Sequence, residues 1–147
     1  MRTKKGIWIT LGILLLIQLI RIDKTNPPID PAVDFQPAVH PPADVMAILK
    51  SACYDCHSSE TRYPWYTNVA PVSWWIKNHI NEAREHFDFS SMGQFQGKQL
   101  ADILADAADV VAEGEMPLNS YTWMHPEARL SAEQRERLVH WMRGEAK

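Results

Sequence analysis

Cysteine is scarce in this chain of 147 residues, which contains only Cys53 and Cys56. A structural zinc site usually takes four ligands from two cysteine or cysteine–histidine pairs, and no second cysteine pair is present to supply them. A thioredoxin-type redox pair needs a β-strand before it, whereas residues 43–53 have the pattern of a short helix. A simple disulfide between the two cysteines stays open.

Excess charge and strand patterning are also lacking. The formal net charge is −3, and no basic patch follows the N-terminal arm, which argues against a nucleic-acid partner. The domain has no alternating strand pattern and no internal repeat, so we predict an all-α fold. Apolar residues at helical spacing predict helices over residues 42–56, 72–85 and 98–113. Ser131 and Gln134 form a capping-box pattern that opens a last helix.

The two cysteines belong to a C-x-x-C-H motif, Cys53-Tyr-Asp-Cys56-His57. This motif is typical of covalent attachment of a c-type haem. Each cysteine sulfur can add to one vinyl group of the porphyrin, and the adjoining imidazole can bind the iron from the proximal side. We therefore predict one covalent haem c, held by Cys53 and Cys56, with His57 as the proximal iron ligand.

A six-coordinate electron-transfer haem also needs a distal ligand, usually methionine or histidine. We favour Met116, which lies in a loop between two predicted helices and is followed by Pro117, a residue that stiffens the backbone. Filling a gap in the core is the alternative role for Met116. His79, on the apolar face of the helix over residues 72–85, is the alternative ligand, although it could instead form a hydrogen bond in the core or to a haem propionate.

Five other histidines and methionines after the motif are further candidates for the distal ligand. Met124 and His125 are weaker candidates, and His86 and His140 are expected at the surface. The full set of remaining candidates is His86, Met92, Met124, His125 and His140.

Aromatic side chains are abundant, with six tryptophans in the chain. They can form an ordinary core or the flat apolar walls that a flat cofactor requires. Residues 61–75 hold five aromatic rings and two prolines. We interpret this stretch either as a lid over the haem, with Tyr63 and Tyr66 close to the propionates, or as plain structural packing.

The N-terminus has the pattern of a membrane anchor or signal segment, which we place at residues 1–23. Its apolar stretch, residues 7–20, is short for a spanning helix but is preceded by basic residues and followed by no small-x-small cleavage site. We therefore favour an uncleaved inner-membrane anchor, with the domain facing the periplasm, or exported there if the signal is cleaved. Residues 24–41 carry five of the prolines and predict an extended tether, and residues 42–147 form the haem-binding domain.

With these features in place, the chain resembles a family of small bacterial proteins that have a cytochrome-c-like haem-binding domain. The resemblance extends from Pro42 to Arg143. Residues 17–21, at which the apolar segment ends, are also similar. Asp88, where the family pattern has asparagine, is a small departure. The resemblance implies covalent haem c, a proximal His57 and a distal Met116, but no defined partner. The stretches that carry it are Cys53–Ser58, Thr61, Tyr63–Tyr66, Ala70–Trp75, Phe87–Ser90, Met116–Pro117 and Trp141.

These observations predict one-electron transfer by a membrane-anchored c-type cytochrome that exchanges electrons with protein redox partners and is not an enzyme. The alternative is a peroxidase-like haem enzyme, or a gas or redox sensor, with an open or labile sixth iron position. Such an enzyme would need polar acid–base groups beside a vacant site, a role that His79 or His125 could fill. A third possibility is a haem module whose redox change biases a partner within a larger complex.

Overall fold

The computed structural model describes residues 2–145, which form helices and connecting segments without a β-strand. The predicted all-α class is confirmed for these residues. The longer helices of the domain are α3 (Ala43–Ala52), α5 (Val72–His86), α6 (Gly97–Ala112) and α8 (Ala132–Glu145). Shorter ones are α2 (Phe35–Val39), α4 (Tyr54–His57), α7 (Asn119–Met124) and the 3-10 helices Ile17–Leu19, Trp65–Asn68, Met92–Gln94 and Pro126–Ala128.

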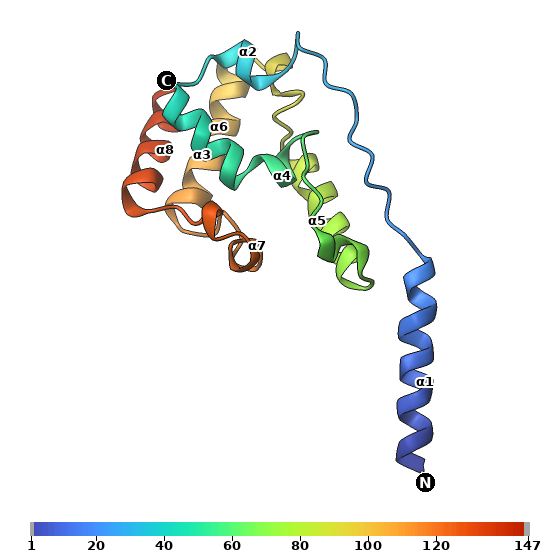
Figure 1. Cartoon of the computed structure of the whole chain (residues 1–147). Helices are drawn as coiled ribbons and strands as arrows, with labels where there is room; N and C mark the ends of the chain where they lie inside the picture. The colour runs from blue at the N-terminus through green and yellow to red at the C-terminus, as the bar shows by residue number, and fades with distance from the viewer. Residues whose placement is uncertain (1, 146–147) are drawn as a thin grey trace.

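The core lies between α3, α6 and α8, which pack together in Figure 1, with α6 and α8 in the most extensive contact. Helix α4 leads from this bundle to α5, and α7 lies at the lower end of the bundle in the same view. Apolar side chains at helical spacing fill the bundle, because burial removes their apolar surface from water. The most deeply buried members are Phe35, Val45, Leu49, Phe89, Met92, Leu104, Ala108 and Leu138.

Helix α2 belongs to this core although its residues lie within the predicted tether. Phe35 is completely buried and its ring contacts the rings of Phe89 and Trp141, with centroids 5.0 and 6.1 Å away. The Phe35 N–H donates to the Phe89 carbonyl over 2.9 Å, and the Gly93 N–H donates to the Val33 carbonyl over 2.7 Å. A Cβ at Gly93 would lie 2.7 Å from that carbonyl oxygen, so only glycine allows this approach.

The predicted membrane anchor is wrong. Helix α1 spans only Arg2–Leu16, and in the described part of the chain no helix has both the length and the apolar character that crossing a bilayer requires. Fifteen residues reach about 22 Å at about 1.5 Å per residue, against a hydrocarbon core of about 30 Å. The predicted location, a domain anchored in the inner membrane and facing the periplasm, depended on that anchor and is corrected with it.

The end of the apolar segment is fixed to the domain instead of continuing as an α-helix. The Gln18 side chain pairs with the backbone of Ala70, donating to its carbonyl over 3.0 Å and accepting its N–H over 2.9 Å. The Trp74 indole N–H donates to the Ile20 carbonyl over 3.0 Å. These contacts hold the chain beside the start of α5, while α1 itself extends away from the other helices (Figure 1).

Candidate functional site

The C-x-x-C-H motif lies at the junction between α3 and α4. Cys53 ends α3 with backbone angles outside the helical range, and α4 then forms one turn that carries the N–H groups of Cys56 and His57 onto the Cys53 carbonyl, at 3.1 and 3.0 Å. Both cysteines are free thiols and half-buried. Burial raises the pKa of the Cys53 thiol to about 12 and that of the Cys56 thiol to about 11.

His57 is held in one orientation by the segment that follows α5. Its Nδ1 lies 3.2 Å from the Phe87 carbonyl oxygen, and its ring stacks on the Phe87 ring with centroids 4.3 Å apart. Because a carbonyl only accepts hydrogen bonds, Nδ1 carries the proton and Nε2 keeps a free lone pair. Burial lowers the pKa of His57 and so favours the neutral imidazole, the form that binds a metal ion.

A cavity of about 250 Å³ brings the predicted ligands together. Cys53, Cys56, His57 and Met116 all line it, as does the alternative ligand His79. Alanine and leucine side chains and the Tyr121 ring contribute apolar surface to its wall. The other lining residues are Ala52, Glu82, Ala83, His86, Pro117, Leu118 and Tyr121.

Met116 is positioned by the loop after α6. Its N–H donates to the Val110 carbonyl over 3.1 Å, and its own carbonyl accepts from the Arg135 guanidinium of α8 over 3.3 Å. The side chain is half-buried and packs against the edge of the core. Met116 therefore contacts the core and also lines the cavity. Core packing and iron ligation, the two roles expected from the sequence, are compatible with each other.

His79 projects from α5 into the same space. Its Nδ1 donates to the Trp75 carbonyl one turn earlier over 3.0 Å, which leaves Nε2 free as in His57. His79 is half-buried and lines the cavity together with Cys56 and Met116. Its geometry is compatible with iron ligation, so His79 stays the alternative distal ligand.

The other candidate iron ligands lie in different parts of the structure. Met92 is fully buried in the core and lines neither this cavity nor its neighbour. His86 is exposed at the rim, and His140 is exposed on α8 beside a different surface hollow. Met124 and His125 lie on the wall of a second, larger cavity.

This larger cavity, of about 360 Å³, adjoins the first, because Cys56, His79, Leu118 and Tyr121 line both. Its walls come from residues 61–67, from α5 and from α7, and they are mostly apolar. Trp65, Trp75 and Trp123 border it although they are 73%, 50% and 77% exposed. Trp141, in contrast, lies in the core, so the tryptophans divide between the two roles that the sequence left open.

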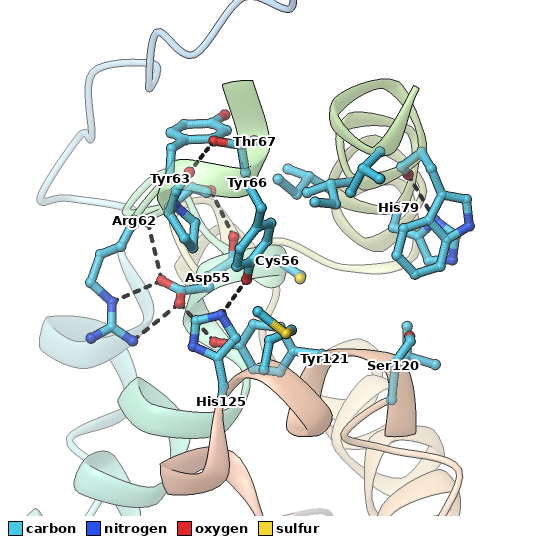
Figure 2. Close-up of a pocket in the computed structure, with 18 of the residues that line it drawn as sticks. Asp55, Cys56, Arg62, Tyr63, Tyr66, Thr67, His79, Ser120, Tyr121 and His125 are labelled. Carbon is cyan, nitrogen blue, oxygen red and sulfur yellow. Dashed lines mark hydrogen bonds and ion pairs between the residues drawn. The ribbon is translucent and has the colours of Figure 1, made fainter. Parts of the chain in front are cut away.

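Polar contacts join the walls of the larger cavity (Figure 2). The Asp55 carboxylate pairs with the Arg62 guanidinium and accepts a hydrogen bond from the Tyr121 hydroxyl. The Tyr66 hydroxyl and His125 Nε2 lie 2.6 Å apart, and His125 Nδ1 lies 3.1 Å from the Glu127 carboxylate. Sequence reasoning did not identify Asp55, Arg62 or Tyr121, because no motif marks the position between the two cysteines or its distant partners.

The residues around these cavities fit a haem. Two free thiols, an oriented imidazole and a thioether face one space, which is the donor set of a covalently attached, six-coordinate haem. The Tyr63 hydroxyl, on the wall of the larger cavity, is buried without a hydrogen-bond partner. A buried hydroxyl is costly unless it is paired, so a polar group of a bound molecule would be stabilised there.

Comparison with known proteins agrees with this fit. A family model described as haem-binding domain matches residues 12–144, which is nearly the whole chain. Neither a curated protein nor a solved structure matches the chain. The match includes the cysteine motif, both cavities and every helix from α2 to α7. This chain belongs to the haem-binding domain family, and haem is the cofactor that the family implies for it.

Proposed function

We propose that this protein is a c-type cytochrome that transfers single electrons to and from protein redox partners. One haem would be attached through thioethers to Cys53 and Cys56, with His57 Nε2 and the Met116 sulfur as iron ligands. The observation that carries the proposal is the shared cavity: these four side chains, distant by up to 63 positions in sequence, line one space. The free lone pair of His57 supports its assignment as proximal ligand.

The bound haem would supply a reversible one-electron couple, and the chain would set its potential. The Phe87 carbonyl fixes the orientation of the His57 imidazole and increases its basicity, as outer partners of metal-bound histidines do. A thioether ligand favours ferrous iron and raises the potential relative to a second histidine. The apolar walls would limit access of water to the iron. Electron transfer of this kind needs no catalytic side chain.

The covalent attachment is tested by maturing the full chain in a host that assembles c-type cytochromes, then denaturing it and extracting with acidified acetone. We expect the haem to stay with the wild-type polypeptide and to be lost from the Cys53→Ala/Cys56→Ala variant. Haem that leaves the denatured wild-type protein would rule out thioether attachment.

The distal ligand is tested by the optical spectrum of the oxidised protein. We expect a methionine–iron charge-transfer band that disappears in Met116→Ala and persists in Met124→Ala. Met124 is the matched control because it lines only the larger cavity and is 45% exposed. A low-spin spectrum that survives in Met116→Ala but is lost in His79→Ala would assign the ligand to His79 instead.

A second candidate function follows from the contacts that join Tyr66, His125 and Glu127, of which Tyr66 and His125 line the larger cavity. Peroxidase-like chemistry needs polar acid–base groups beside an open iron position, and these residues have the required chemistry. A five-coordinate, high-spin ferric spectrum of the wild-type protein would favour this function over electron transfer.

A further inference from the structure

Asp55 is a buried carboxylate in the middle of the cysteine motif, and its contacts reach two other segments. The residue is only 6% exposed. Its two oxygens accept four hydrogen bonds, three from Arg62 and one from Tyr121. A buried charge requires such pairing, and here the partners come from two different segments that both line the larger cavity.

The first partner belongs to the loop after the motif. Arg62 donates from its backbone N–H over 3.1 Å and from Nε and Nη2 over 3.0 and 3.1 Å, which is a two-point guanidinium–carboxylate pair. The Arg62 side chain is itself 65% exposed, so burial alone does not fix its position. Together these hydrogen bonds hold both oxygens of Asp55 and fix the position where the loop begins.

The second partner belongs to α7, which follows the Met116 loop. The Tyr121 hydroxyl donates to Asp55 Oδ2 over 2.7 Å, and its ring stacks on the His125 ring with centroids 4.3 Å apart. Burial, together with the hydrogen bond to the carboxylate, raises the pKa of Tyr121, so the hydroxyl stays protonated and remains a donor. Tyr121 lines both cavities and lies five residues after Met116.

We propose that Asp55 is a positioning residue that holds α7, and with it the Met116 segment, against the cysteine motif. The contact joins the turn that carries Cys56 and His57 to the segment that carries the proposed distal ligand. Its function is to keep the sixth iron position closed to external ligands. The inference rests on the proposed cytochrome function, because it presupposes that Met116 binds the iron.

The test is imidazole binding to the oxidised, haem-loaded full chain, followed by loss of the methionine–iron charge-transfer band. Imidazole reaches the iron only when Met116 has moved away, so its apparent dissociation constant reports the open fraction. A hydrogen bond to a charged acceptor is expected to change that equilibrium by about tenfold or more. We therefore expect Tyr121→Phe and Asp55→Asn to bind imidazole about tenfold more tightly than the wild type.

Two further variants separate positioning from general stability. Asp44→Asn removes another two-point guanidinium–carboxylate pair, an exposed one, because Asp44 on α3 contacts Arg137 on α8 at 2.6 and 3.2 Å, away from both cavities. We expect this variant to bind imidazole like the wild type. The double variant Asp55→Asn/Tyr121→Phe should bind imidazole no more tightly than Asp55→Asn alone, since both substitutions act on the same Asp55–Tyr121 contact.

The outcomes are distinct. Unchanged imidazole binding in Tyr121→Phe, which loses only a hydroxyl and retains the ring packing, would overturn the positioning role even if Asp55→Asn failed to fold. An equal change in Asp44→Asn would also overturn it, by pointing to loss of stability as the cause. A wild-type protein without thioether haem or without the methionine band would instead reject the proposed function itself.

Discussion

At the scale of single residues, the sequence identifies side chains whose chemistry is rare and misses those whose role depends on contact. Cys53, Cys56 and His57 are recognisable because few other functions use that spacing. The Phe87 carbonyl that orients His57 could come from any residue type, so no sequence pattern predicts it. Asp55 is likewise an ordinary acidic residue until Tyr121, distant in sequence, is placed beside it.

Asp34 provides a prediction at this scale. Its Oδ1 is buried without a partner, and burial raises the pKa of the carboxyl above the ordinary 3.8. The folded state therefore holds the proton more tightly than the unfolded state, and this contribution to stability is lost as pH rises through the folded pKa. We expect Asp34→Asn to have a higher melting temperature than the wild type at about pH 7, with the difference vanishing below about pH 4.

The control for Asp34 is Asp44, whose pKa is lowered chiefly by its hydrogen bond to Arg137. Here the stability is present above the ordinary pKa and is lost as pH falls. Asp44→Asn should therefore melt below the wild type at neutral pH, which is the opposite sign. Thermal unfolding of both variants across this pH range measures the two differences. A difference for Asp34→Asn that stayed constant with pH would contradict the argument.

At the scale of elements, long helices are predictable and single turns are not. The expected helices over residues 72–85 and 98–113 agree with α5 and α6 to within a residue, because each has several turns of apolar periodicity. The expected helix over residues 42–56 is interrupted at Cys53. Helices α2 and α7 were not predicted, since five or six residues are too few for periodicity and are stabilised by tertiary packing.

The start of α8 provides a prediction for an element. Ser131 Oγ accepts the Gln134 N–H over 3.1 Å, and Gln134 Oε1 accepts the Ser131 N–H over 2.9 Å, which confirms the predicted capping box. We expect Ser131→Ala to lower the free energy of unfolding by about 1 kcal/mol, measured by chemical denaturation. Ser131→Asp, which keeps an acceptor at the cap, is the control and should lose much less. Equal losses in the two variants would contradict a capping role.

At the scale of the whole molecule, the sequence pattern assigns the N-terminal segments to an anchor and a tether, whereas the fold packs parts of them against the domain. Residues 24–41 are rich in proline and polar residues, the composition of a tether, yet they contain Phe35, which is completely buried. One buried side chain does not change the average composition of a segment. The apolar N-terminal stretch was also misjudged. Its α-helix is shorter than a membrane span, and the Gln18 side chain just beyond it pairs with the Ala70 backbone, a contact that the sequence does not reveal.

The contribution of α2 to the whole fold leads to the last prediction. Phe35 connects α2 to Phe89 and Trp141, and the Phe89 N–H in turn donates to the His57 carbonyl over 2.8 Å. Phe35→Ala would leave a cavity that fixed helices cannot fill, so we expect it to lower the free energy of unfolding by about 3–5 kcal/mol.

Val39→Ala is the matched control for Phe35→Ala, because Val39 lies on the same helix and is only partly buried against the core. Its loss should be about 1 kcal/mol or less, since less apolar area returns to water. Urea unfolding of both variants, with the m-value compared to confirm two-state behaviour, measures the difference. If Phe35→Ala lost no more stability than Val39→Ala, α2 would be a peripheral attachment, and the haem-binding domain would begin after it. A large difference would extend the cooperative unit toward the N-terminus, because only a segment that unfolds with the core can contribute its buried area to the core's stability.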